Sequence, residues 1–256
     1  MTALYPEIIY GPVHSRRLGL SLGVNLLPLQ SKICSFDCIY CECGWNGDHR
    51  GQMRFNPRES VSEALEAHLR KMAAEGALPD VITFAGNGEP TMHPDFEAII
   101  GDTLALRDRY SPATKVSVLS NATQIGRESV RRALLRVDNN ILKLDSAFDE
   151  TVRLMNNPCG EYSVAQTVGR MKLFEGRMIL QTMFLRGSFD GRHIDNTTDK
   201  EVGAWLELVK EIAPQSVMVY SIARDTPCTT IEKVSREELE HIADRVRALG
   251  TECSVA

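Results

Sequence analysis

Short apolar runs alternate with amphipathic segments along this chain. Short runs rich in β-branched residues are typical of buried strands, whereas apolar positions that recur every three or four residues indicate helices. We expect strands at residues 22–27, 81–85, 115–120, 141–145, 178–185 and 216–222. We expect helices within residues 56–72, 94–104, 127–137, 148–174, 198–212 and 235–250. The pattern therefore predicts six consecutive strand–helix units.

Three of these helices follow recognisable start signals. Asn56 precedes a proline and is expected to cap the first helix. Thr198 is followed three residues later by Glu201, and Ser235 by Glu238, as in a capping box. These signals set the expected beginnings of the first, fifth and sixth helices.

Strict alternation of strands and helices predicts a parallel sheet covered by helices, curled in one direction by right-handed crossovers. Six units are too few for a closed eight-stranded barrel. The expected fold is an open, partial (βα)6 TIM-like barrel of parallel strands with outer helices, and an open doubly wound sheet is the alternative. In both, the functional site lies at the carboxyl ends of the strands. We expect one core domain over residues 1–256, with an N-terminal extension at 1–20 and a cysteine-bearing loop at about 28–56.

The composition is that of an ordinary globular protein. The 256 residues are 43% hydrophobic and 25% charged, and the formal net charge is −5. This charge argues against a large nucleic-acid footprint, which needs clustered Lys and Arg. No apolar run reaches the ~18 residues of a membrane span, and the first residues do not resemble a signal peptide. We therefore expect a cytoplasmic protein without membrane contact.

Three cysteines lie close together in the loop after the first expected strand. Cys34, Cys38 and Cys41 are separated by three and then two residues, so their thiolates can converge on one metal centre. They leave one ligand position open where a closed cluster has four. A structural zinc site, with Cys43 as fourth ligand, is the alternative. A disulfide is not expected in a reducing compartment.

Polar residues follow the other expected strands at the same edge of the sheet. Beyond the cysteine loop, these strand-end residues are Gly86-Asn87-Gly88-Glu89-Pro90, Ser120-Asn121, Asp145-Ser146, Gln181 and Tyr220-Ser221. Their clustering is independent of the cysteine spacing and indicates the same site.

The cysteine loop, with aromatic Tyr40 just before its last cysteine, resembles the cluster loop of radical S-adenosylmethionine (radical SAM) enzymes. Residues 86–90 resemble the glycine-rich segment after the second strand of that superfamily, with Asn87 as its second member. The six strand–helix units match its partial barrel, so the resemblance covers essentially the whole chain.

The resemblance implies two cofactors. Cys34, Cys38 and Cys41 would bind three irons of a 4Fe–4S cluster, and S-adenosylmethionine (SAM) would chelate the fourth through its amino and carboxylate groups. An electron from the cluster would cleave SAM into methionine and a 5′-deoxyadenosyl radical that abstracts hydrogen from a substrate. The expected electron donor is a reduced flavodoxin or ferredoxin-type protein. Cys43, two residues past the motif, is expected to be a spare thiol and not a ligand, because the open iron is needed for SAM. Cys159, Cys228 and Cys253 are scattered singly, so one cluster is expected.

The cofactor contacts are expected among the strand-end residues. Glycines in the 86–90 loop expose backbone carbonyls to the SAM amino group and permit close approach, and the alternative is a plain turn. The residues expected around SAM are Tyr40, Gly86, Asn87, Gly88, Glu89, Ser120, Asn121, Ser146, Gln181 and Tyr220.

Lys143 and Asp145 alternate onto one face of the fourth expected strand, and we expect that face to point inward. A buried lysine there would have a lowered pKa and would bind or activate a carbonyl or acidic substrate. If the face points outward, Lys143 is an ordinary surface lysine. Arg16 and Arg17 offer a second place for an acidic group.

Residues 11–24 and Lys143-Leu144-Asp145 resemble the group that includes the tRNA wyosine-base synthases. The chain lacks that group's additional cysteines, flavodoxin-like domain and basic surface, so the superfamily chemistry is carried over and the tRNA substrate is not. The substrate can be a small molecule or RNA. The sequence also allows an activase of a glycyl-radical partner, or a non-catalytic zinc or iron–sulfur module. Loops 186–200 and 223–235 are expected to decide the substrate.

Overall fold

A computed structural model describes residues 4–15, 18–48, 51 and 53–256. Its main sheet contains β1 (Ile9–Ser15), β2 (Gly19–Val24), β3 (Val81–Phe84), β4 (Lys115–Ser120), β5 (Asn139–Lys143), β6 (Ile179–Met183), β9 (Ser216–Tyr220) and β11 (Glu252–Val255). The strand order is β1-β2-β3-β4-β5-β6-β9-β11. From β2 to β11 all neighbours are parallel, whereas β1 is antiparallel to β2.

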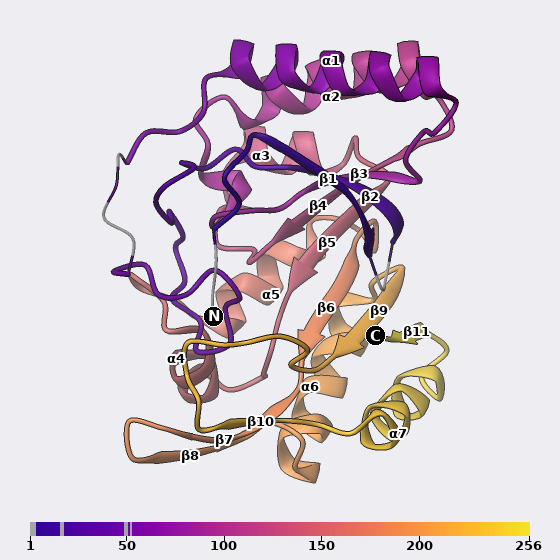
Figure 1. The fold of residues 1–256 in the computed structure, drawn as a ribbon. Coiled ribbons are helices and arrows are strands. Elements are labelled where there is room, and N and C mark those ends of the chain that lie inside the picture. The colour runs from indigo at the N-terminus through magenta and orange to yellow at the C-terminus, as the bar shows by residue number, and fades with distance from the viewer. Residues whose placement is uncertain (1–3, 16–17, 49–50, 52) are drawn as a thin grey trace.

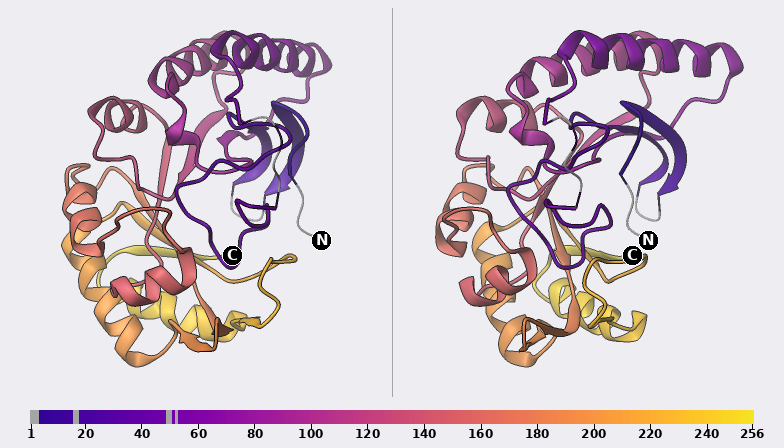
Figure 2. Two further views of the ribbon diagram at one scale, coloured as in Figure 1. Left: turned by 90° about the vertical axis from the view of Figure 1, so that its left-hand side faces the viewer. Right: turned by 60° about the vertical axis from the view of Figure 1, so that its left-hand side comes forward.

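The helices cover the outer side of this curled sheet (Figures 1 and 2). They are α1 (Arg58–Glu75), α2 (Phe96–Tyr110), α3 (Glu128–Leu134), α4 (Asp149–Asn156), α5 (Val164–Lys172), α6 (Asp199–Ile212) and α7 (Arg236–Arg247), with a short 3-10 helix η1 (Pro90–Met92). Strands β1 and β11 form the two ends of the sheet, so it stays open. The predicted open, partial barrel of parallel strands with outer helices is confirmed.

The two faces of the sheet differ in polarity because successive side chains of a strand point to opposite faces. Leu22, Phe84 and Val118 belong to the apolar core that the helices cover. The other face carries polar contacts between strands: the hydroxyls of Ser21 and Thr83 lie 2.8 Å apart. The inside of the barrel is therefore hydrogen-bonded and receptive to polar groups.

The predicted order of elements is confirmed, but several boundaries differ. Strands β2 and β5 begin and end earlier than the apolar runs predicted, because the loops that follow them are also buried. The segment at 148–174 is two helices: Asn157 has a left-handed backbone at φ 40° and Pro158 follows it. A proline blocks continuation of the helix.

The sequence pattern did not predict the elements that lack a long apolar run. These are β1, β11, and a small sheet of β7 (Leu185–Phe189), β8 (Arg192–Asp195) and β10 (Ile231–Lys233) in the order β10-β7-β8. The small sheet lies within the two loops, 186–200 and 223–235, that were expected to decide the substrate.

The helix-start predictions have mixed outcomes. Ser235 forms a complete capping box with Glu238, and Thr198 accepts a hydrogen bond from the Glu201 backbone. The prediction for Asn56 is wrong. Its side-chain amide instead donates to the carbonyls of Asn25 and Leu27, at 3.0 and 2.7 Å, and so fixes the end of β2.

One close backbone contact joins the cysteine loop to the loop after β3. Ile33 donates to the Asn87 carbonyl at 3.0 Å and accepts from the Glu89 backbone at 3.0 Å. Between these two bonds, Gly88 has φ 135°, and a Cβ there would lie 1.8 Å from the Ile33 carbonyl oxygen. Only glycine permits this approach.

Among the helices that the structure describes, none combines the length and the apolar composition needed to span a membrane.

Replacing Gly88 by alanine is expected to lower the free energy of unfolding by about 3 kcal/mol, because the new Cβ strains the backbone and displaces the cysteine loop. Denaturant titration followed by circular dichroism measures this. Gly203→Ala is the matched control, since a Cβ at that position in α6 meets nothing within 4 Å. The control should be neutral or up to about 1 kcal/mol more stable. Equal unfolding midpoints for Gly88→Ala and the wild type would contradict the close approach.

Candidate functional site

The cysteine loop is held by three separate parts of the chain. Besides the contact with the loop after β3, Ile39 donates from its backbone to the Met155 carbonyl at the end of α4, at 3.0 Å. The Cys228 backbone, in the segment between β9 and β10, donates to the Ile39 carbonyl at 3.2 Å. These contacts hold the loop over the carboxyl ends of the barrel strands (Figures 1 and 2).

The three predicted cysteines occupy one region of this loop. The Cys38 thiol interacts electrostatically with both Cys34 and Cys41. Among the described residues, however, no three His, Cys, Asp or Glu side chains converge closely enough to hold a single metal ion. The thiols that bind a 4Fe–4S cluster each bind a different iron, and three neighbouring thiols on one loop have the chemistry that such a cluster needs.

The thiols lie in different electrostatic surroundings. Burial raises the pKa of the Cys38 thiol to about 11, with the Cys41 charge adding to the effect. The pKa of Cys41 is lowered to about 6, because the Cys43 thiol donates a hydrogen bond to it and the Lys32 ammonium adds to this against the opposing effect of burial. Cys43 itself is buried and lies 3.4 Å from the Gly86 carbonyl oxygen.

Lys32 lies inside the loop and was not predicted from the sequence. Only 1% of the residue is exposed, and its Nζ lies 2.7 Å from the Gly44 carbonyl and 3.3 Å from Asp37 Oδ1. Burial works against its charge, but electrostatic interactions with the cysteines of the loop, Cys41 first, and with Asp37 outweigh burial and raise the pKa of Lys32. The lysine is therefore charged.

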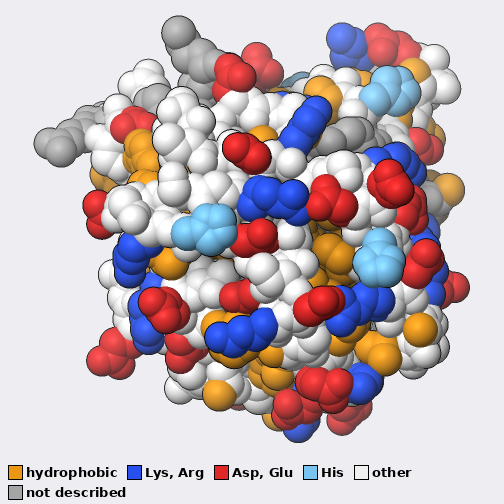
Figure 3. Space-filling model, turned by 90° about the horizontal axis from the view of Figure 1, so that it is seen from below, with side chains coloured by type: hydrophobic (Ala, Val, Ile, Leu, Met, Phe, Trp, Pro, Cys, Tyr) orange, Lys and Arg blue, Asp and Glu red, His pale blue; other side chains and the backbone are white. Residues whose placement is uncertain are grey.

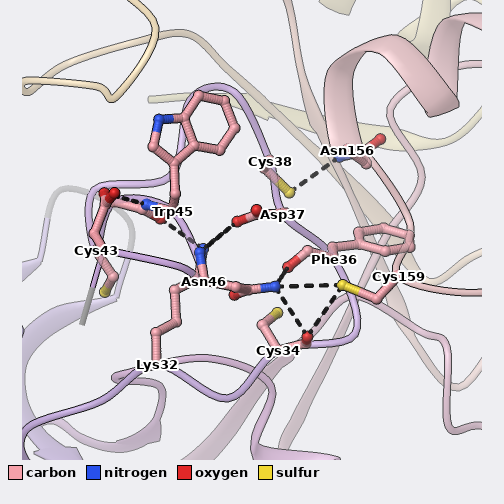
Figure 4. A network of polar contacts seen from close by, with 12 residues as sticks. Lys32, Cys34, Phe36, Asp37, Cys38, Cys43, Trp45, Asn46, Asn156 and Cys159 are labelled. Carbon is pink, nitrogen blue, oxygen red and sulfur yellow. Dashed lines mark hydrogen bonds and ion pairs between the residues drawn. The ribbon is translucent and has the colours of Figure 1, made fainter. Parts of the chain in front are cut away.

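Asn46 connects the two ends of the cysteine loop (Figure 4). Its backbone donates to Asp37 Oδ1 at 2.7 Å, and its side-chain amide lies 3.3 Å from the Cys34 carbonyl and 3.1 Å from the Phe36 carbonyl. The same amide lies 3.3 Å from Cys159 Sγ, which places that exposed thiol against the outside of the loop.

Two asparagine amides approach the cysteine sulfurs. Asn121 Nδ2 lies 3.6 Å from Cys34 Sγ, and Asn156 Nδ2 lies 3.5 Å from Cys38 Sγ. Asn121 was predicted near the cofactor, whereas Asn156, at the end of α4, was not. Asn156 lies 118 positions from Cys38 in the sequence, and no sequence pattern around it indicates this contact.

Glu89 is fully buried and ties the loop after β3 to the end of β4. Its carboxylate accepts from the Ser120 hydroxyl at 2.9 Å, from the Asn121 backbone at 2.6 Å and from both the backbone and hydroxyl of Thr91. Burial raises the pKa of Glu89 although these donors oppose the shift. Both carboxylate oxygens are thus used to position Ser120 and Asn121.

The Asn87 side chain is also used within the fold. Its amide pairs with the backbone N–H and C=O of Tyr5, at 2.8 and 2.9 Å, and donates to the Pro28 carbonyl at 2.8 Å. The segment of Gly86, Asn87, Gly88 and Glu89 therefore lies against the cysteine loop, and its polar side chains point into protein contacts.

Lys143 points into the barrel and belongs to a polar network. Its Nζ lies 2.5 Å from the Tyr220 hydroxyl and 3.6 Å from Asp145 Oδ1. Asp145 accepts from the Tyr40 hydroxyl and, at 2.7 Å, from the Asn156 amide. The network therefore extends from β5 to the cysteine loop.

The electrostatic state of Lys143 differs from the prediction. Burial opposes its charge, but Asp145, then Tyr220 and Cys38, outweigh burial and raise its pKa. The expected lowering of the pKa is therefore wrong, because the inward face also supplies negative charge. Lys143 is a cation at neutral pH.

The remaining predicted residues do not share one environment. Gln181 is the β6 partner of Lys143, and its buried Nε2 has no hydrogen-bond partner among the described residues. Ser146 is turned toward α6, where its hydroxyl donates to Glu201 at 2.6 Å. Arg16 and Arg17 lie outside the described residues.

The segment between β9 and β10 reaches the outer side of the cysteine loop. Arg224 forms an ion pair with Glu42 at 2.7 Å. A cavity of about 650 Å³ lies between this segment and the loop, lined by Trp45, Asp48, residues 224–229 and Ile231. The 223–235 loop therefore lies against the cysteine loop, and its role in deciding the substrate stays a prediction.

Comparisons with known proteins agree with this arrangement. Residues 30–187 match the family model described as the Radical SAM superfamily. The chain is 28% identical over 238 residues to a protein named GTPase Obg from Brachyspira hyodysenteriae, which covers 91% of this chain and 32% of that protein. It is 32% identical over 212 residues to a UPF0026 protein from Methanocaldococcus jannaschii, which covers 81% of this chain and 61% of that protein. The chain thus spans less than two thirds of the length of these two relatives.

A solved structure shows the same fold. The crystal structure of a radical SAM methyltransferase from Sphaerobacter thermophilus superposes with a TM-score of 0.68 over 92% of this chain and 65% of that one, at 15% sequence identity. The family model spans more than half of the chain and includes the three cysteines and strands β3 to β6. The chain therefore belongs to the radical SAM superfamily of enzymes, whose cofactors are a 4Fe–4S cluster and S-adenosylmethionine.

Proposed function

We propose that Cys34, Cys38 and Cys41 each bind one iron of a 4Fe–4S cluster and that SAM occupies the fourth iron. The observation that carries this proposal is the donor set: three thiols of one loop, which is held against the edge of the sheet, lie close enough to interact electrostatically with one another. Cys43 is left outside the ligand set because its thiol donates to Cys41.

When bound, the cluster and SAM supply reductive cleavage of SAM to methionine and a 5′-deoxyadenosyl radical, which abstracts hydrogen from the substrate. The chain's residues prepare the site for this chemistry. Phe36 and Tyr40 are buried in the loop, and we propose that they help to shield the bound cluster from water. The amides of Asn121 and Asn156 point at sulfur, where such donors tune a cluster.

We propose that the loops after β3 and β4 receive SAM. Glu89 acts as a positioning residue here, because its carboxylate orients Ser120 and Asn121. Gly86 and Gly88 contribute backbone groups, and Gly88 permits the close approach of the two loops. Tyr40 and Tyr220 are proposed to line the same site, and the Lys143 Nζ lies 5.1 and 5.0 Å from the centroids of their two rings.

The inward cation Lys143 is proposed to receive an acidic group of the substrate. A charged ammonium is a poor nucleophile, so we assign Lys143 to binding and Asp145 to holding it in place. On the face seen in Figure 3, acidic and basic side chains are interspersed. With the net charge of −5, this favours a small acidic molecule over RNA, whose binding needs clustered positive charge.

Changing a ligand cysteine tests the proposal. After anaerobic reconstitution, Cys38→Ser is expected to bind less iron and sulfide per chain and to form no 5′-deoxyadenosine with dithionite and SAM, because one iron loses its thiolate. Cys253→Ser, in β11, is the matched control and should behave as wild type. The proposal would be contradicted if the wild type contained one zinc per chain and no sulfide. It would also be contradicted if Cys38→Ser cleaved SAM as fully as the wild type.

The charge pairing of Lys143 gives a second test. Asp145→Asn is expected to lower the free energy of unfolding by about 3 kcal/mol, because Lys143 then keeps a buried charge without its carboxylate. Lys143→Met combined with Asp145→Asn should recover most of this loss, since no unpaired charge remains. Denaturant titration of both single variants and the double variant measures the coupling. If the double variant is less stable than Asp145→Asn, the two residues are not paired in this way.

A further inference from the structure

Lys32 is an unusual residue for the centre of a loop. Lysine is almost never fully buried unless it is paired, yet Lys32 is among the largest fully buried side chains of the protein. Its position two residues before Cys34 places it at the base of the cysteine loop. The proposed chemistry of the cysteines and SAM gives it no role.

The Lys32 ammonium is held by contacts within the cysteine loop: its Nζ lies 3.3 Å from Asp37 Oδ1 and 2.7 Å from the Gly44 carbonyl oxygen. Asp37 Oδ1, at 3.3 Å, also accepts from the Asn46 backbone, so its negative charge is shared. Lys32 lies two residues before Cys34, and its ion-pair partner Asp37 directly precedes Cys38, so the ammonium lies among the ligand cysteines of the loop. Figure 4 shows Lys32 reaching up between Cys34 and Cys43 toward Asp37 and Asn46.

We propose that the Lys32 ammonium is a fixed positive charge that stabilises the reduced state of the iron–sulfur cluster and thereby raises its reduction potential. The inference rests on the proposed function of the three cysteines. One electron from the reductant enters the cluster and no bond forms or breaks, so reduction adds one negative charge. A buried ammonium attracts that added charge with little screening by water.

The same geometry predicts an opposite role for Asp37. Its carboxylate lies in the same loop, and its negative charge disfavours an added electron. Removing the charge of Lys32 should therefore lower the potential, whereas removing the charge of Asp37 should raise it. A purely structural role for either residue predicts no such opposition of sign.

The test is a dye-mediated redox titration of the reconstituted full chain without SAM, followed by the paramagnetic signal of the reduced cluster. Lys32→Met removes the charge, Lys32→Gln removes it but keeps a donor for Gly44, and Lys32→Arg keeps it. Lys32→Met and Lys32→Gln are expected to lower the ratio of reduced to oxidised cluster at least about tenfold at a fixed applied potential. For a one-electron couple, a tenfold change in this ratio corresponds to a shift of about 59 mV in the reduction potential. Lys32→Arg should stay close to wild type, and Asp37→Asn should shift the ratio upward.

Iron and sulfide per chain are measured before each titration. If the wild type contains no sulfide, the proposed function has failed before Lys32 is tested. If the wild type contains the cluster, three results overturn the inference. The first is that Lys32→Met and Lys32→Gln titrate at the wild-type potential, and the second is that these two variants and Asp37→Asn shift the potential in the same direction. The third is that Lys32→Met and Lys32→Gln fold but bind no iron. The last result would assign Lys32 to holding the loop and not to tuning the cluster.

Discussion

The backbone pairing of Ile33 with the loop after β3 is the contact on which the site depends. Two hydrogen bonds and the absence of a side chain at Gly88 bring the cysteine loop directly onto the sheet edge. Glu89 then ties the same loop to Ser120 and Asn121 at the end of β4. The cysteines and the first two strand-end loops therefore form one connected unit, in which displacement of one loop displaces the others.

A second property of the site is its charge. Two buried or nearly buried lysines, Lys32 below the thiols and Lys143 inside the barrel, are each held by an aspartate and kept positive by nearby negative groups. Both lysines interact electrostatically with Cys38. Because burial alone would discharge a lysine, these cations persist only through their surroundings, and they give the site a field suited to anions.

Much of the fold could be predicted from the sequence, because each strand–helix unit carries its own apolar pattern. The units were recognised from Leu22 onward, whereas β7, β8 and β10 were missed because short polar strands depend on partners elsewhere in the chain. The cysteine spacing indicated the site directly. Lys32 and Asn156 could not be identified in this way. Neither residue stands out in the sequence, and only the folded chain places them near the cysteine sulfurs.

The sequence by itself determined the order of elements, the open barrel and the cysteine motif, since periodicity and spacing are local properties of a chain. Only the tertiary structure decided what the polar residues do. It directed Asn87 and Ser146 into protein contacts, made Glu89 a link between loops, and kept Lys143 charged beside Asp145. The physical reason is that hydrogen-bond partners and electrostatic surroundings come from residues far apart in sequence, which only the folded chain brings together.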